Sequence, residues 1–471
     1  MDRLSAGVLI FAHSVRKLNE QSMQLAQETL SGWGNIPKSS CKVQYIRNIA
    51  DLSEPVPGTT VLPRGLGRSY ADQATNEGQV VLKMEKMNHF LSFDEERGIL
   101  HCEAGVSLEE ILAHFVPRGW FPMITPGTKY VTIGGAIAND VHGKAHHADG
   151  SFVNCVYDFT IRLADGAILR ASREENPDLF WANFGGLGLM GTILTATIQL
   201  RKIETSYFRQ KAFAAKNLEE MLDAIDRTAD EFPASVAWID PMARGKRLGR
   251  GVLSMGDHAR LDELPAKLKK DPLKVGKKPR ITVPFYLPAF ALNKLTVGIL
   301  DMVIYNMQKS APSFSHYDKF FYPLDMINNW NRGYGKRGFI QYQFVIPLTD
   351  GLKNIRLILE QITQSNCTPF LNVLKKFGKE QGGLLSFPFE GYTFAIDFPV
   401  TPQLKPFTRK LDQMVLEMGG RIYLGKDAYL DEQTFKAMYP QYVDWLAIKK
   451  KYDPGNVFSS DLARRIGLVN A

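Results

Sequence analysis

The sequence predicts an α+β protein of two domains, and three observations carry this prediction. Short β-rich runs alternate with helical segments from Val43 to Leu200. The pattern changes near Lys202, where longer amphipathic segments begin, and changes back near Gly420. A chain of 471 residues is also long enough for two or three domains, each with its own hydrophobic core.

The first part of the chain is expected to open with a polar helical N-terminal extension, residues 1–30, before a body that begins near Trp33. Apolar residues at helical spacing predict a helix over Leu108–Phe115, with Ser107 as N-cap and Glu110 completing a capping box. Asp165-Gly166 separates two β-rich runs and predicts a hairpin turn. Strands are expected at Val80–Met84, Gly98–Glu103 and Asp158–Leu163.

The part from Lys202 onward reads as longer helices and strands. An amphipathic helix is expected over Leu218–Thr228, followed by a strand at Ser235–Asp240. After Gly420 a pattern of glycines and strands returns before a basic helical end. Further along, strands are expected at Phe339–Pro347 and Thr393–Phe398, and helices at Leu352–Gln364 and Phe407–Met418.

A basic tract, Lys267–Arg280, holds seven basic residues against one acid. Directly after it comes an apolar lip, Val283–Leu292, which Pro284 and Pro288 interrupt. One interpretation is a solvated loop followed by a core segment. The other is a basic collar beside an apolar edge that rests on anionic lipid. The net charge of +8 leaves nucleic acid, a phosphorylated substrate and a membrane surface open as anionic partners.

Cysteine usage and hydropathy limit the class of protein. The spacing of Cys41, Cys102, Cys155 and Cys367 favours reduced thiols or core residues over a disulfide framework. No run approaches the ~18 apolar residues of a membrane span. The apolar run Ala6–Ala12 is as short as a signal-peptide core can be, and no clean cleavage site follows it. A soluble or peripheral protein is expected.

Two glycine-rich stretches indicate where a large ligand binds. Pro126–Gly150 contains five glycines and three histidines, a costly composition for a core but a suitable one where backbone approaches a ligand closely. Pro63–Asp72 follows the strand-like Thr59–Leu62, and Arg64 and Arg68 add positive charge to it. Its successive N–H groups can form an anion-binding nest. A tight turn would explain either stretch alone, but two such loops are typical of a cradle for one pyrophosphate.

A third glycine cluster matches the dinucleotide fingerprint G-x-G-x-x-G at Gly186, Gly188 and Gly191. That fingerprint needs a strand before it and a helix after it, so that the helix N-terminus faces the pyrophosphate. Here the order is reversed, because a helix is expected at Asp178–Asn183 and a strand at Thr192–Leu200. Close packing of a helix end on a strand is therefore favoured over a Rossmann site.

Five segments together resemble the FAD-dependent oxidases of the vanillyl-alcohol oxidase / p-cresol methylhydroxylase superfamily, and within it the decaprenylphosphoryl-β-D-ribose 2′-oxidases. The similarity runs from about Ser31 to Leu468. It implies an FAD-binding domain of the p-cresol methylhydroxylase type, built from residues 31–203 and 420–471. A substrate-binding domain with an antiparallel sheet and helices, residues 204–419, is inserted between them. The segments are Arg64–Asp72, Pro126–Gly150, Gly185–Gly191, Gln341–Pro347 and Gly420–Asp427.

The resemblance implies FAD as the cofactor. In many relatives a histidine just before a Ser-Tyr or Ser-Phe pair attaches the flavin covalently. Arg68 stands at that position and lacks a suitable nucleophile, so the FAD is expected to be non-covalent. The expected contacts are Pro63, Arg64, Gly65, Leu66, Gly67, Arg68, Ser69, Tyr70, Ala71, Asp72, Gln73, Gly127, Thr132, Ile133, Gly134, Gly135, Asn139, Asp140, Val141, His142, Ile193 and Tyr423.

Oxidation of a secondary alcohol needs a hydride acceptor, here the flavin, and a group that receives the hydroxyl proton. The resemblance implies Lys426, Tyr70 and His142 as the catalytic residues. A lysine base needs a pKa far below the usual ~10.4, lowered by desolvation or a nearby cation. No regularly spaced carboxylates or cysteines accompany the histidines around His142, so hydrogen bonding to flavin or substrate is favoured over a metal site.

The resemblance also implies a set of substrate-binding residues. Gln341 and Gln343 alternate along a strand, so both side chains face one side, as recognition of sugar hydroxyls requires. Two pocket positions depart from the family, which usually has asparagine and cysteine where this chain has Thr393 and Ala395. Phe321-Tyr322 stands where the family often has two tyrosines. The expected set is Lys144, Gln341, Gln343, Thr393, Ala395 and Trp238.

The implied activity is oxidation of the 2′-hydroxyl of a polyprenylphosphoryl-β-D-ribose to the 2′-keto sugar. This is the first half of epimerisation to the arabinose donor of cell-wall arabinan, which a separate NAD(P)H-dependent short-chain reductase completes. The implied partners are the polyprenyl-phosphate sugar and a membrane surface, without nucleic acid. The implied location is cytoplasmic or peripheral at the inner membrane, with the periplasmic face left open. The alternatives are a soluble alditol or aldonolactone oxidase, and a flavin-binding subunit with little turnover.

Overall fold

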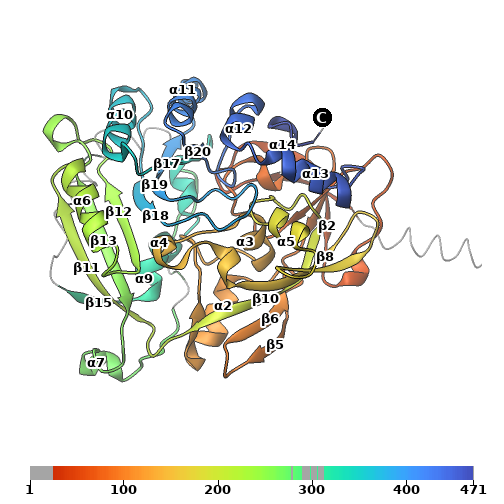
Figure 1. Cartoon of the computed structure of the whole chain (residues 1–471), viewed down its shortest axis with the longest axis horizontal. Coiled ribbons are helices and arrows are strands. Elements are labelled where there is room, and N and C mark those ends of the chain that lie inside the picture. Colours follow the sequence, from red (N-terminus) through yellow and green to blue (C-terminus); the bar gives the residue numbers. More distant parts are fainter. Residues whose placement is uncertain are drawn as a thin grey trace, which may run out of the picture.

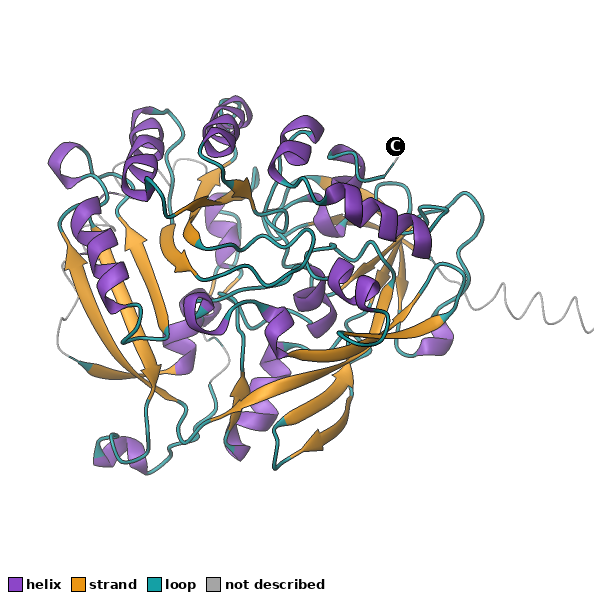
Figure 2. Ribbon diagram, viewed as in Figure 1, coloured by secondary structure: helices purple, strands orange, loops and turns teal. Residues whose placement is uncertain are grey.

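The computed structural model describes residues 25–276, 279, 281–288, 298, 305 and 312–469. Helices flank three larger sheets, and this arrangement confirms the predicted α+β class (Figures 1 and 2). Within the described residues, no helix combines enough length and hydropathy to cross a bilayer. All four cysteines are free and buried, which confirms the prediction of core residues over a disulfide framework.

Two sheets form the part of the molecule that carries the glycine-rich loops. The first has the order β1(Ala26–Ser31)-β2(Lys38–Tyr45)-β4(Val80–Lys83)-β3(Val61–Arg64). The second has the order β5(Phe90–Asp94)-β6(Ile99–Glu103)-β10(Thr192–Lys202)-β8(Val156–Arg162)-β9(Ile168–Ser172), and β7(Trp120–Pro122) also pairs with β10. The antiparallel pairing of β8 with β9 confirms the hairpin predicted at Asp165-Gly166.

The third sheet has eight strands, all paired antiparallel. Its order is β15(Ser313–His316)-β11(Tyr207–Ala215)-β13(Gly251–His258)-β12(Ala234–Ile239)-β18(Asn372–Phe377)-β19(Gly391–Pro399)-β17(Phe339–Pro347)-β20(Arg421–Ile422). A separate parallel pair joins β14(Ile281–Thr282) to β16(Ile327–Asn328). The edge strand β20 comes from the segment 420–471, so the last part of the chain adds a strand to the sheet built by residues 204–419.

Local sequence signals account for several helices. The helix α2 begins after Ser107, whose side chain accepts a hydrogen bond from Glu110 N while the Glu110 carboxylate accepts from Ser107 N, so the predicted capping box is confirmed. The helix α5 precedes β10, in the order that excludes a Rossmann fingerprint at Gly186. The described α-helices are α2(Leu108–Phe115), α3(Ile133–Ala138), α4(His146–Asp149), α5(Pro177–Asn183), α6(Leu218–Thr228), α7(Ala266–Lys269), α9(Tyr317–Phe321), α10(Gly351–Gln364), α11(Leu404–Glu417), α12(Glu432–Met438), α13(Tyr442–Tyr452) and α14(Asp461–Arg465).

The prediction for the N-terminal end was wrong, and that for the C-terminal end was right for its basic helices, α13 and α14, but wrong for further strands. The expected helical extension 1–30 includes β1, whose residues alternate outward and inward and pair with β2; residues 1–24 lie outside the described part of the chain. After Gly420 the structure has only the two-residue strand β20 and then three helices, seen along the top right of Figure 1. Gly425 and Gly455 lie in turns before helices, and Gly467 lies in a turn after α14, so most of these glycines do not mark strands.

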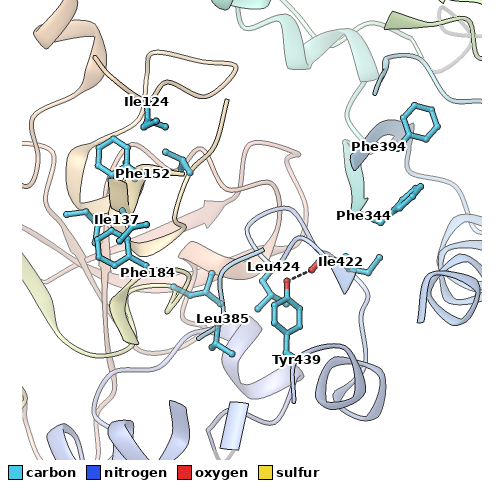
Figure 3. Packing of buried hydrophobic residues seen from close by; sticks show 14 of the residues in the cluster. Ile124, Ile137, Phe152, Phe184, Phe344, Leu385, Phe394, Ile422, Leu424 and Tyr439 are labelled. Carbon is cyan, nitrogen blue, oxygen red and sulfur yellow. Dashed lines mark hydrogen bonds between the residues drawn. The ribbon is translucent and has the colours of Figure 1, made fainter. Parts of the chain in front are cut away.

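One hydrophobic core continues from the loop-bearing part into the eight-stranded sheet. Figure 3 shows members from both parts, with Ile137 and Phe184 on one side and Phe344 and Phe394 on the other. Leu385 and Leu424 lie between them, and the Tyr439 hydroxyl donates to Ile422 O at 2.7 Å. Because the two parts share this core, the segments on either side of it hold fixed positions relative to one another.

A buried ion pair ties the C-terminal helices to the third glycine cluster. Lys449 Nζ on α13 pairs with Asp453, donates to Leu189 O at 2.6 Å, and donates to Phe458 O at 2.9 Å. The Lys449 and Asp453 side chains are 1% and 0% exposed, so neither charge has water to replace its partner.

We predict that Lys449→Ala lowers the free energy of unfolding by about 3–5 kcal/mol, because it leaves the Asp453 carboxylate buried without its cation. Urea titration measures this. The exposed neighbour Lys450 provides the matched control, and Lys450→Ala should change the free energy of unfolding by less than about 0.5 kcal/mol. Equal effects of the two variants would show that the buried pair does not support the fold.

Candidate active site

A cavity of about 1000 Å³ lies between the glycine-rich loops and the eight-stranded sheet. This volume is at the upper end of the range for small-molecule sites, about 300–1000 Å³. The loop after β3 and the segment around α3 form one wall. Strands β12, β17, β18 and β19 contribute side chains to the opposite wall. The segment from α9 to the short 3₁₀ helix Trp330–Tyr334 borders the cavity as well.

The loop after β3 contains a row of backbone donors without partners among the described residues, in the wall of this cavity. The amides of residues 65–69 form no hydrogen bond with any residue that the structure describes, although all five residues line the cavity. Gly67 adopts φ = 63°, a left-handed conformation that suits glycine. Five successive unpaired N–H groups are what an anion-binding nest requires. The pyrophosphate of a dinucleotide fits these donors.

The backbone at the start of α3 does not offer free N–H groups to a pyrophosphate, although the sequence predicted that both glycine-rich stretches would cradle one. Its amides are already used, since Ile133 N donates to Val106 O, Gly134 N to Ala104 O, and Gly135 N to Thr132 Oγ1. The segment therefore offers a close backbone surface instead of N–H donors. Close packing explains Gly65 in the facing loop, because a Cβ there would lie 2.2 Å from Thr132 Oγ1.

The two arginines of the loop after β3 are held by the protein itself. Arg64 donates to Ala74 O at 2.5 Å and to Ser31 O at 2.8 Å, which explains how β1 packs beside this loop. The Arg68 guanidinium lies 4.1 Å from the centre of the Trp33 ring, and its Nε donates to Tyr130 O at 3.2 Å. Both keep positive charge beside the row of amides, but neither offers a nucleophile for a covalent flavin bond.

Lys426 reaches the cavity from the turn after β20. Its Nζ donates to Gln341 Oε1 on β17 and lies 5.2 Å from the centre of the Tyr70 ring. Burial and, to a smaller extent, the positive charge of Lys375 lower the pKa of Lys426 to about 7, although Asp397 opposes the shift. A lysine with this pKa is partly neutral near pH 7 and can accept a proton, which meets the requirement stated from the sequence.

His142 and Gln343 form a second polar pair in the cavity wall. Gln343 Nε2 lies 3.2 Å from His142 Nε2 and 3.0 Å from Thr393 Oγ1, whose own hydroxyl donates to Phe344 O. Burial, followed by the charge of Lys375, holds the pKa of His142 well below its usual value, so the ring is neutral. With Nε2 accepting, Nδ1 carries the proton. Neither His142 Nδ1 nor Gln343 Oε1 has a partner among the described residues, which leaves one donor and one acceptor for a ligand.

Two more lysines with lowered pKa line the cavity. Burial lowers the pKa of Lys144 to about 7 and that of Lys375 to about 8. Lys144 Nζ donates to Phe320 O, and Lys375 lies 5.7 Å from the Phe377 ring centre. The sequence-based set omitted Lys375, although Val373 and Lys375 alternate along β18 and both line the cavity, as does Leu371 just before the strand. A period-two pattern could have revealed this face of the strand.

Most of the expected site residues come together in this one cavity. The lining includes Pro63, Arg64, Gly65, Leu66, Gly67, Arg68, Ser69, Tyr70, Gln73, Gly127, Thr132, Gly134, Gly135, Asn139, Val141, His142, Lys144, Ile193, Trp238, Gln341, Gln343, Ala395, Tyr423 and Lys426. Other lining residues were not expected from the sequence, among them Trp33, Tyr130, Gly188, Phe320, Asp325 and Lys375. Within the described residues, no group of three or more His, Cys, Asp or Glu side chains could hold a metal ion.

Five expected residues do not line the cavity: Ala71, Asp72, Ile133, Asp140 and Thr393. Asp72 pairs with Arg465 on α14 at 2.7 Å, and the Asp140 carboxylate accepts from Ser151, Ser386 and Val153 N. Ile133 is fully buried in the main core. These residues do not face the cavity but support its wall. They hold the loops in place, and Thr393 holds the Gln343 side chain through a hydrogen bond.

The free amides, the neutral histidine donor and the unpaired Asn139 Oδ1 together fit a large, polar, anionic cofactor such as FAD. A family model of an FAD binding domain matches residues 36–172, which include both glycine-rich loops. A second model, of D-arabinono-1,4-lactone oxidase, matches residues 339–466, which include β17 and Lys426. The fold and the site therefore define an FAD-dependent oxidoreductase.

Comparison with known proteins narrows this class. The chain is 38% identical over 450 residues to the decaprenylphosphoryl-β-D-ribose oxidase of Mycolicibacterium smegmatis, covering 93% of this chain and 97% of that protein. An uncharacterised protein of Streptomyces coelicolor is 31% identical over 376 residues, 77% of this chain and 100% of its own length. Mouse L-gulonolactone oxidase is 32% identical over 168 residues, only 34% of this chain and 36% of that enzyme. The chain belongs to the family of the decaprenylphosphoryl-β-D-ribose oxidases.

We predict that the FAD is bound without a covalent link. Arg68 precedes Ser69 and Tyr70, at the position where many relatives have the histidine that attaches the flavin, and its side chain has no suitable nucleophile. Acid precipitation of the purified yellow protein should release all of the flavin absorbance into the supernatant. A control precipitation of free FAD mixed with albumin calibrates recovery. A yellow pellet that survives washing would contradict the prediction.

Proposed function

We propose that this protein oxidises the 2′-hydroxyl of a polyprenylphosphoryl-β-D-ribose to the 2′-keto sugar. The observation that carries the proposal is Lys426, a partly neutral lysine in the same cavity as the row of free amides. The similarity over nearly the whole chain to an oxidase of decaprenylphosphoryl-β-D-ribose supports this choice of substrate. FAD, when bound, supplies the hydride acceptor.

The side chains of the cavity accept the proton, bind the ligands and provide the apolar wall. Neutral Lys426 accepts the proton of the 2′-hydroxyl, while Gln341 Oε1 holds one of its N–H groups. Gln343 Oε1 and His142 Nδ1–H offer an acceptor and a donor for the sugar or the cofactor. Burial raises the pKa of Tyr70 well above its usual value, so its hydroxyl stays protonated and acts as a donor instead of a base. Trp238 and Ala395 provide apolar wall.

We further propose that residues 31–203 and 420–471 hold the FAD and that residues 204–419 hold most of the substrate. The keto sugar needs a second enzyme for reduction to the epimeric alcohol, and we assign that step to a separate NAD(P)H-dependent short-chain reductase. A lipid-linked substrate places the protein at a membrane surface, and the inner membrane is the proposed location.

We predict that anaerobic mixing with polyprenylphosphoryl ribose removes the yellow colour of the enzyme-bound flavin, whereas xylitol and gulonolactone leave it unchanged. Stopped-flow absorbance measures the rate. The reverse selectivity would replace the proposal with an alditol or aldonolactone oxidase, to which the family-model match over residues 339–466 points.

We predict that Lys426→Ala retains FAD but bleaches it at least ~100-fold more slowly than the wild type, as expected for removal of a general base. An unchanged rate would exclude Lys426 from the reaction.

The apolar lip supports a membrane-facing proposal, since its described residues 283–288 are not part of the core. Phe285 is 62% exposed and Tyr286 is 37% exposed. Ile281, 63% exposed, pairs across β14 and β16 with Ile327, which lines the cavity. This exposed apolar edge is therefore continuous with the cavity mouth. Lys267, Lys269 and Lys270 in the preceding basic tract are exposed, and we propose that tract and edge together rest on anionic lipid.

We predict that Ile281→Ser/Phe285→Ser reduces co-sedimentation with vesicles of anionic phosphatidylglycerol by at least ~10-fold, because each change removes about 1.5–3 kcal/mol of apolar burial. Val443→Ser, at an exposed apolar residue on α13, is the control and should bind vesicles as the wild type does. Equal binding by all three proteins would refute the membrane role of this edge.

A further inference from the structure

Asp397 is a fully buried carboxylate on β19 that does not line the cavity, yet it belongs to the polar network of Lys426. It accepts a hydrogen bond from Gln341 Nε2 at 2.5 Å and another from the Tyr334 hydroxyl at 3.0 Å. The other end of the Gln341 amide, Oε1, accepts from Lys426 Nζ. A single side-chain amide thus connects the buried carboxylate to the lysine.

The chemistry of a carboxylate makes this connection directional. An ionised carboxylate has no proton to donate, so it binds only the NH₂ end of the Gln341 amide. The carbonyl end is then left to face Lys426, where it accepts a hydrogen bond from the amine. If the amide were reversed, its NH₂ group would face the lysine N–H groups, and the carbonyl would face the carboxylate. Asp397 therefore selects one of two amide orientations.

The electrostatic surroundings of Lys426 combine the cation Lys375 with the anion Asp397, while the buried His142 ring is neutral. Lys375 on β18 and His142 after α3 face it, together with the rings of Tyr70 and Tyr423. Asp397 supplies the negative charge among these neighbours, and its attraction raises the pKa of Lys426 against the effects of burial and Lys375. Burial raises the pKa of Asp397 itself to about 6, while its bonds to Gln341 and Tyr334 hold it down.

We propose that Asp397 is a positioning residue, which holds the Gln341 carbonyl toward Lys426 and keeps this lysine poised between its charged and neutral forms. The proposal rests on the proposed role of Lys426 as the proton acceptor. Asp397 would act through Gln341, since Gln341 lines the cavity and Asp397 does not. Without the carboxylate, the amine would lose protons at a lower pH and lose its fixed acceptor.

The test is the pH at which Lys426 gains its neutral form, measured in the FAD-loaded, substrate-free enzyme. Trace acetic anhydride acetylates only neutral amines, and mass spectrometry of the Lys426 peptide reports the extent at each pH. The wild type should show a midpoint near pH 7. Asp397→Asn should lower the midpoint by about one unit, since the negative charge is lost. Asparagine can also present either a donor or an acceptor to Gln341, so the single amide orientation is lost.

A matched control is Asp412 on α11, a buried carboxylate that accepts from the Tyr342 hydroxyl at 2.9 Å and does not line the cavity. Asp412→Asn should leave the Lys426 midpoint unchanged. Tyr334→Phe keeps the Asp397 carboxylate but removes one of its two donors, so it should move the midpoint downward by less than Asp397→Asn. Thermal unfolding and flavin content show whether Asp397→Asn folds. If it does not fold, Tyr334→Phe takes its place in the test.

An unchanged or raised midpoint in Asp397→Asn, or in Tyr334→Phe where the first variant cannot be obtained, overturns the proposal. An equal shift in Asp412→Asn also overturns it, because the effect would then be general. Labelling does not depend on turnover. A shifted midpoint in an enzyme that does not oxidise the ribose substrate would defeat only the proposed function, and oxidation with an unmoved midpoint would defeat only the role of Asp397.

Discussion

The side-chain amide of Gln73 is the interaction on which the arrangement of the site depends. Its Nε2 donates to Leu424 O at 2.7 Å and to Asp427 O at 2.6 Å, at the two ends of the turn that carries Lys426. Its Oε1 accepts from Ala71 N, at the end of the loop that presents the free amides. The eight-stranded sheet holds the same turn, since Tyr423 N donates to Gln343 O. One buried residue thus fixes the distance between the anion-binding loop and the proposed base.

This fixed arrangement explains how three lysines can face one cavity. Desolvation disfavours the charged form of an amine, and each neighbouring cation adds to the effect, so the pKa of Lys144, Lys375 and Lys426 falls to between about 7 and 8. On a mobile loop these side chains would turn toward water and recover their usual pKa. Here the shared core and the Gln73 amide prevent that movement, and the cavity keeps bases that work near neutral pH.

Short-range signals in the sequence predicted short-range structure well. The capping box at Ser107 and the Asp165-Gly166 hairpin depend on neighbouring residues, and both were confirmed. The family resemblance brought most cavity residues together, including Lys426 and Gln343. Lys375 was missed because nothing in its own segment shows that β18 pairs with β12, a strand distant in the sequence. Nor could a linear pattern show that the α3 amides bond to Val106 O and Ala104 O, or that Asp397 reaches Lys426 through Gln341.

The central claim is that hydride leaves C2′ of the ribose as a nearby residue accepts the hydroxyl proton. Anaerobic stopped-flow mixing with polyprenylphosphoryl ribose deuterated at C2′ tests it most directly. The account predicts slower bleaching of the flavin than with unlabelled substrate, and an unchanged rate when the deuterium is at C3′. The account would be contradicted if deuterium at C3′ slowed the bleaching of the flavin and deuterium at C2′ left its rate unchanged.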